Sequence, residues 1–165
     1  MVSTIDVATR TKDPTDIDVG ASPSALAITP DGKTVFLAAE SVSTIDVATR
    51  TKNPTDIPVG QSPNGVAITP DGKTVFVTNY ESGSVSVIDV KSRSKKPTDI
   101  GGIYEATLNG VAITPDGKTV FVATTIGALS TINVTTLKKN PTDIRMGEGP
   151  SGVAITPCHS RKRGR

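Results

Sequence analysis

Residues 42–60 read VSTIDVATRTKNPTDIPVG, and close copies of this text begin at Val2, Val85 and Leu129. The copies start about 40 to 45 residues apart, a period that indicates one supersecondary unit per repeat. Such a unit buries its apolar face only against neighbouring units, so the repeat decides the architecture. It does not identify a ligand.

Each repeat has the periodicity of β-strands. Residues 65–69, 74–79, 85–90 and 55–59 are short runs rich in Val, Ile and Thr, bounded by Pro, Gly, Asp or Asn. Between the first two runs lies Pro70-Asp71-Gly72-Lys73, which is typical of a tight connection between antiparallel strands. We therefore expect an all-β protein of four-stranded antiparallel sheets. Sheets at this period pack around an axis as β-propeller blades, with the run 65–69 innermost.

The repeats predict one propeller region over residues 1–157 and a basic, disordered tail over residues 158–165. Complete blades are expected at about 25–59, 65–100 and 110–146, with partial blades at both ends. The fold is thus a partial propeller, an open arc whose apolar blade faces invite self-association. Because CHSRKRGR follows Pro157 where the repeat predicts another strand, we interpret the chain as a truncated or frame-shifted product, or a fragment of a larger propeller.

The stretch NGVAITPDGKTVFVTNYESGSVSVIDV, residues 64–90, resembles the YVTN-repeat β-propellers of microbial surface-layer-type proteins. The namesake tetrapeptide corresponds to Phe76-Val77-Thr78-Asn79, and the resemblance covers nearly all of residues 2–157. It implies a WD40-like ring of about seven blades that serves as a binding or surface platform and shares no common reaction. Two copies depart from the motif, reading FLAA at 36–39 and FVAT at 121–124.

Composition excludes several classes of protein. The chain has one cysteine, so it forms no intrachain disulfide, and no apolar run approaches the length of a membrane span or signal peptide. As written it is expected in the cytoplasm, although similar proteins are often exported. The formal charge is +2, with a basic cluster confined to the tail, so we expect no nucleic-acid partner.

No motif predicts catalysis, a cofactor or a metal site. The text AITPDGKT at Ala27, Ala67 and Ala112 fits a permissive phosphate-loop pattern, but Pro and Asp fill the loop and a strand follows it. Cys158 and His159 are adjacent and lack the spacing of ligands. Aspartates that recur in every repeat indicate scaffold, because an active site singles out one or two copies. A lactonase or redox propeller enzyme remains an alternative and would need a catalytic set at the axis.

The loops vary between copies on one rim only, the rim that carries the connections between the second and third strands and between successive blades. Repeat proteins usually place recognition on such a surface. We therefore predict a non-catalytic binding or scaffold module with a protein or glycan partner. Unselected loop drift and a purely structural, self-associating fragment are the alternatives. The predicted contact patch consists of Asn79, Tyr80, Glu81, Tyr104 and Glu105.

Overall fold

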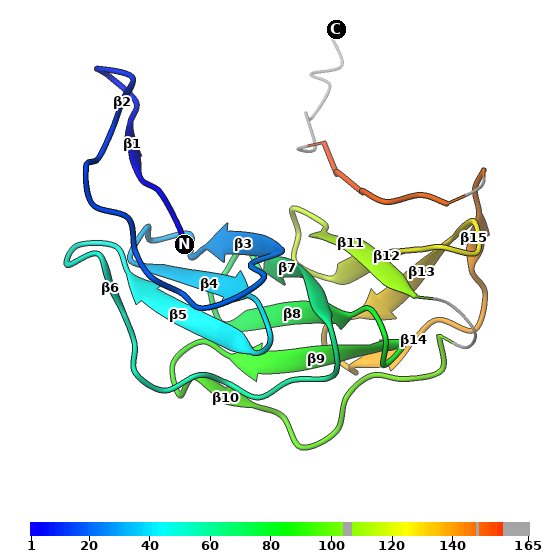
Figure 1. Ribbon diagram of the computed structural model, residues 1–165. Helices are drawn as coiled ribbons and strands as arrows, with labels where there is room; N and C mark the ends of the chain where they lie inside the picture. The colour runs from blue at the N-terminus through cyan, green and yellow to red at the C-terminus, as the bar shows by residue number, and fades with distance from the viewer. Residues whose placement is uncertain (104–106, 148, 157–165) are drawn as a thin grey trace, which may run out of the picture.

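The computed structural model describes residues 1–103, 107–147 and 149–156. Three antiparallel sheets fan out side by side around a common inner edge (Figure 1). All assigned elements in the described part are β-strands. The predicted fold, an all-β partial propeller with three full blades and partial blades at the ends, is confirmed. Within the described ranges no helix is long and apolar enough to cross a bilayer.

Each full blade runs outward from the axis in chain order. Blade 1 contains β3 (Ala25–Ile28), β4 (Thr34–Ala38), β5 (Val42–Asp46) and β6 (Thr51–Lys52). Blade 2 contains β7 (Pro63–Ile68), β8 (Thr74–Asn79), β9 (Ser84–Asp89) and β10 (Ser94–Lys95). Blade 3 contains β11 (Leu108–Ile113), β12 (Thr119–Thr124), β13 (Ala128–Asn133) and β14 (Lys138–Lys139), and β15 (Ile144–Arg145) also pairs with β13.

The outer strand of each blade differs from the sequence expectation. A single outer strand was expected at residues 55–59, but the structure pairs β6 with β5 and resumes with an isolated bridge between Val42 and Ile57. Pro54 interrupts the ladder because it has no N–H to donate. The side chain of Asn53 instead accepts a hydrogen bond from the N–H of Thr55 at 3.0 Å. The NPTDI text therefore encodes a break in the edge strand.

Partial elements flank the three blades. At the start of the chain, β1 (Ile5–Asp6) and β2 (Thr11–Lys12) form a hairpin, extended by a bridge between Val2 and Ile17. At the other end a partial blade was expected before Pro157, but the structure assigns no strand in residues 151–156. That segment lies beside β11, where the N–H of Gly110 donates to the Ser151 carbonyl oxygen at 2.9 Å.

The hydrophobic core lies between the blades. We call the face of a blade toward the next repeat its rear face and the opposite one its front face. Phe36 on the rear face of blade 1 shares a core with Val75 and Val77 on the front face of blade 2. Phe76 repeats this arrangement against Val120 and Val122 of blade 3. Both phenylalanines are fully buried, and burial of such a side chain contributes about 1.5–3 kcal/mol.

Side-chain hydrogen bonds tie the inner strands to one another around the axis. Ser24 Oγ donates to the Pro63 carbonyl at 2.8 Å, and Asn64 Nδ2 donates to that of Leu108 at 3.4 Å. Asn109 Nδ2 continues the series to the Pro150 carbonyl at 3.3 Å. Gly65 allows the close approach that this requires, because an added Cβ would lie 2.8 Å from the Asn109 carbonyl oxygen. The blades are thus fixed at their inner edges.

Candidate binding site on the loop rim

The two rims of the arc carry different connections. On one rim, the N–H groups of Val47, Val90 and Val134 donate to the carbonyls of Lys33, Lys73 and Lys118, which joins the turn after the third strand to the turn after the first. We call this the turn rim. The opposite rim, called the loop rim, carries the connections between second and third strands and those that lead into the next blade.

The turn rim repeats the same bonds in every full blade. In blade 2, Asp71 Oδ1 accepts from the Thr69 hydroxyl at 2.6 Å and from the Lys73 N–H at 3.1 Å. These bonds lower the pKa of Asp71 below its ordinary value, with the Thr69 hydroxyl as the largest cause. The same pattern holds at Asp31 and Asp116. These carboxylates organise the turns between the first and second strands.

The turns after the third strands use a second recurring acid. Asp46 Oδ1 accepts from the N–H of Thr49 at 2.8 Å and from its hydroxyl at 2.9 Å. These bonds lower the Asp46 pKa, the N–H being the larger cause. The turn then passes through Arg50 in the left-handed region, at φ 56°. Asn133 occupies the matching position in blade 3 and accepts from the N–H of Thr136 at 2.9 Å, so this position requires an acceptor and not a charge.

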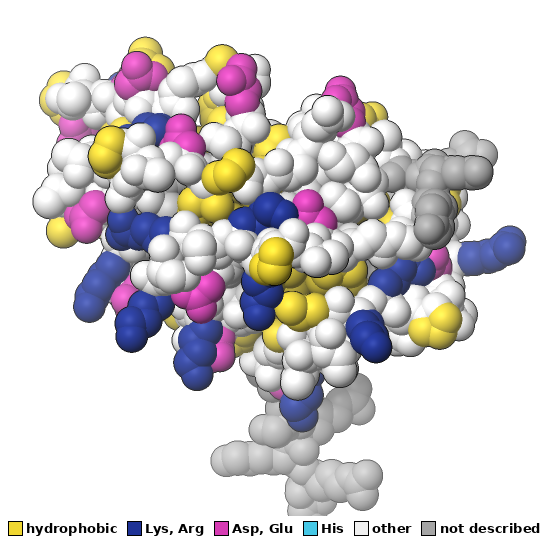
Figure 2. Space-filling view, turned by 90° about the horizontal axis from the view of Figure 1, so that it is seen from below, with side chains coloured by type: hydrophobic (Ala, Val, Ile, Leu, Met, Phe, Trp, Pro, Cys, Tyr) yellow, Lys and Arg dark blue, Asp and Glu magenta, His cyan; other side chains and the backbone are white. Residues whose placement is uncertain are grey.

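The outer side of the arc carries a third repeated device. An ion pair links a Lys in each outer strand to the Asp four residues later, at 2.7–2.8 Å. The pairs are Lys12–Asp16, Lys52–Asp56, Lys95–Asp99 and Lys139–Asp143. Figure 2, a view from below, shows Lys and Arg side chains spread over this side with Asp and Glu among them. The paired side chains are partly exposed to solvent. Ion pairs at a protein surface contribute about 0–1 kcal/mol each, and charged side chains on an edge strand discourage pairing with another chain.

The loop rim of blade 2 brings two loops together. The loop between β8 and β9, residues 80–83, is called the Tyr80 loop, and residues 60–62 before β7 are called the Gln61 loop. The N–H of Tyr80 donates to the Ser62 carbonyl at 2.8 Å, and the N–H of Gln61 donates to Ser82 Oγ at 2.6 Å. Two loops from different parts of the repeat are therefore fastened together.

Asn79 lies beneath these loops and is fully buried. Its Nδ2 donates to Ser84 Oγ at 3.1 Å and to Ser86 Oγ at 2.9 Å. The prediction that Asn79 contacts a partner at the surface is wrong, because its amide lies inside blade 2. Gly60 packs directly on it, and a Cβ at Gly60 would lie 2.6 Å from Asn79 Nδ2. Asn79 supports the site from below.

Of the predicted patch, Tyr80 and Glu81 lie on the surface of the Tyr80 loop, and 38% of Tyr80 is exposed. Tyr104 and Glu105 lie outside the described residues. Their described neighbour Thr107 bonds Thr125 of blade 3, hydroxyl to hydroxyl at 2.7 Å. The N–H of Thr125 also donates to the Thr107 carbonyl at 3.1 Å, the same bond that joins Tyr80 to Ser62 in blade 2.

Sequence reasoning missed Gln61 and Ser82, which are exposed and complete the surface around Tyr80. A signal was present in the comparison of repeats, since the blade 2 loop alone carries Tyr, Glu, Ser and Gly together. Across the described ranges, no group of three or more His, Cys, Asp or Glu side chains is arranged to hold a metal ion.

Comparison with solved structures places the fold among propellers. The structure is similar to a chain of Kuenenia stuttgartiensis hydrazine synthase, with TM-score 0.75 and 30% identity, over 86% of this chain and 41% of that one. It is similar to the RRP9 WD40 repeats, with TM-score 0.71 and 19% identity, over 79% and 41%. For U3-55K the TM-score is 0.69 and the identity 18%, over 79% and 42%. The chain spans less than half the length of each of these solved chains.

A search of curated proteins found no match. The family model described as lactonase, 7-bladed β-propeller, matches residues 2–112, more than half of the chain. Together with the stacked four-stranded blades, this match assigns the family. The chain belongs to the lactonase-type family of seven-bladed β-propellers.

Proposed function

We propose that this chain is a non-catalytic binding module of the YVTN-repeat, surface-layer type that recognises a protein partner through the Tyr80 loop and the Gln61 loop. The observation that carries the proposal is that the two loops are fastened to each other while Tyr80 and Glu81 stay exposed. A surface held in one conformation loses less entropy on binding.

The chemistry of the loops favours a protein partner over a glycan. Tyr80 offers a large amphipathic ring with few rotatable bonds, and Ser62, Ser82 and Gln61 offer adaptable hydrogen-bonding groups. This pairing of aromatic anchor and small polar residues is the composition of binding loops that recognise protein surfaces. Glu81 adds a negative charge that selects partners by electrostatic complementarity.

Two alternatives use other parts of the molecule. A lactonase or redox enzyme would need a catalytic set at the axis. The recurring aspartates Asp31, Asp71 and Asp116 lie instead in the turns of the turn rim, where they are engaged in turn bonds. A structural unit that requires self-association would use the apolar faces at the ends of the arc. That second alternative is favoured by Phe121, which is partly exposed while Phe36 and Phe76 are fully buried.

The test is selection of peptides displayed on phage against the immobilised chain, followed by affinity measurement on the wild type and on Tyr80→Ala. Loss of a central aromatic anchor is expected to weaken binding by about tenfold or more. Because Tyr80 is partly exposed, the variant is expected to keep the wild-type circular dichroism spectrum.

Lys33→Ala on the turn rim serves as the matched control and is expected to bind the selected peptides like the wild type. Peptides that bind Tyr80→Ala and the wild type equally would overturn the proposed site. A glycan array that gives binding lost in Tyr80→Ala, with no peptide selected, would replace the protein partner with a glycan.

A further inference from the structure

The rear face of blade 3 has the same design as the two buried rear faces but lacks a full blade against it. Val42 and Val85 are fully buried, whereas the matching Leu129 is partly exposed. Ile57 is 4% and Ile100 7% exposed, whereas the matching Ile144 is 48% exposed. With Phe121, these side chains form an apolar face that the described residues leave partly exposed, and we call it the open rear face.

The N-terminal hairpin has the complementary property. Its Ile5 matches Ile45, Ile88 and Ile132, which are at most 2% exposed, but Ile5 itself is 65% exposed. In blades 1 to 3 this isoleucine lies on the front face and packs toward the preceding blade. Ile5 is thus a front-face residue with nothing in front of it among the described residues.

The two internal junctions show how these surfaces fit. Ile88 shares one core with Phe36, Val42 and Ile57. Ile132 shares the next core with Phe76, Val85 and Ile100. A third junction of the same geometry, with the hairpin placed behind blade 3, would bring Ile5 against Phe121, Leu129 and Ile144. Within one chain these surfaces belong to opposite ends of the arc (Figure 1).

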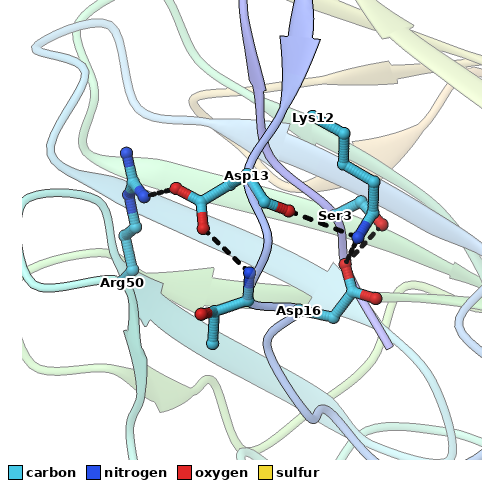
Figure 3. Close-up of polar contacts among 6 residues, drawn as sticks. Ser3, Lys12, Asp13, Asp16 and Arg50 are labelled. Carbon is cyan, nitrogen blue, oxygen red and sulfur yellow. Dashed lines mark hydrogen bonds and ion pairs between the residues drawn. The ribbon is translucent and has the colours of Figure 1, made fainter.

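The N-terminal hairpin is attached to blade 1 through contacts that leave Ile5 exposed. Its Val2 and Ile17 pack on the front face of blade 1 together with Val19. Figure 3 shows the polar side of this attachment, where Arg50 of blade 1 forms an ion pair with Asp13. Within the hairpin itself, Asp16 accepts a hydrogen bond from Ser3 Oγ at 2.7 Å and forms an ion pair with Lys12 at 2.7 Å. The hairpin is therefore anchored by its rear face and presents its front face.

We propose that a second copy of this chain docks head to tail, with the N-terminal hairpin of one copy seated on the open rear face of the other. The composite blade so formed takes its outer strands from one copy and its inner segment, residues 151–156, from the other. The contact is heterologous, since different surfaces of the two copies meet. This inference is independent of the proposed partner site, which lies on the loop rim of blade 2.

Sedimentation equilibrium of the full chain tests the contact. The wild type is expected to associate reversibly. If it still sediments as a single chain at about 100 μM, a concentration at which even a weak interface would form, the proposal is overturned. Ile5→Asp and Ile144→Asp each place a charge in the contact and are expected to raise the dissociation constant roughly 10- to 100-fold. Both side chains are largely exposed in the single chain, so the variants are expected to fold.

Mixing the two variants distinguishes head-to-tail docking from a symmetric contact. Ile144→Asp retains an intact hairpin and Ile5→Asp retains an intact open rear face, so the equimolar mixture is expected to recover association that neither variant shows alone. A mixture that sediments like the separate variants would overturn the head-to-tail arrangement. So would wild-type association that neither substitution weakens.

Tyr80→Ala is the matched control, because it lies in blade 2 away from both surfaces. It is expected to associate like the wild type while it loses the selected peptides. Conversely, Ile5→Asp is expected to keep peptide binding. The two proposals therefore fail separately.

Discussion

At the scale of single residues, Asn79 fastens the end of β8 to β9 and supports the Gln61 loop. Its two donated hydrogen bonds reach Ser84 and Ser86, and Ser86 Oγ also accepts from the Gly60 N–H at 3.4 Å. In the N-terminal hairpin and in blades 1 and 3 the matching serines donate instead to aspartates in the outer segments, at Asp16, Asp56 and Asp143. In blade 2 the matching serine, Ser86, accepts hydrogen bonds from Asn79 and from the Gly60 N–H.

Gly60→Ala tests this arrangement, because the added methyl would lie 2.6 Å from Asn79 Nδ2 and 2.7 Å from its Cγ. Asn79 is fully buried and cannot move aside without losing its bonds. The expected loss is about 1–3 kcal/mol in the free energy of unfolding, measured by urea titration. Gly101→Ala is the control, since nothing lies within 4 Å of the added atom. Equal stability of the two variants would contradict the packing described here.

The burial of Asn79 could not be read from the sequence. An amide next to Tyr and Glu in a variable loop resembles a surface contact residue, and the groups that bury it come from other segments. Gly60 lies almost twenty residues upstream, and Ser86 lies in the next strand. Tyr80 and Glu81 were placed on the surface from the sequence because loop position alone decides their exposure.

At the scale of elements, the repeat text predicted the inner three strands of each blade and missed the shape of the fourth. Alternating Val and Ile in residues 74–79 and 85–90 have the period of a strand, and the Pro-Asp-Gly turn sets their connection. The outer strand is only two residues long before Pro interrupts it. So short a run carries no periodic signal, and its pairing depends on the neighbouring third strand.

The turns make stability depend on acid pH. Bonds from neighbouring N–H and hydroxyl groups hold the pKa of Asp46, Asp71 and Asp89 below the ordinary 3.8. A folded-state pKa below the unfolded one gives stability that is complete above about pH 5 and is lost as pH falls through 3.8 toward the lowered values. The urea midpoint is therefore expected to be constant near neutrality and to fall below pH 4.

The double variant Asp46→Asn and Asp89→Asn is the matched comparison. Asn133 already holds this position in blade 3, so an amide fits the turn and accepts the same bond without titrating. The acid loss is expected to be shallower in the variant than in the wild type. Parallel curves for the two proteins would show that these carboxylates do not set the pH dependence.

At the scale of the whole molecule, the chain is an arc with one well-covered blade between two partly covered ones. Blade 2 packs against blade 1 on its front face and against blade 3 on its rear face. Of the residues that the structure describes, only the N-terminal hairpin lies in front of blade 1, and Leu26 and Ile28 are 49% and 54% exposed. The repeat predicted this open arc. The proposed contact between Ile5 and the open rear face came only from comparing the burial of matching residues in each repeat.

Amide hydrogen exchange measured residue by residue by NMR tests the stacked-blade arrangement most directly. Exchange reports local opening, which is costliest where strands are paired on both sides and packed on both faces. We predict slowest exchange in β8 and β9, intermediate rates in β4, β5, β12 and β13, and fastest exchange in the two-residue strands β6, β10 and β14. Protection that is uniform across the three repeats, or strongest in the outer segments, would contradict an arc of blades packed face to face.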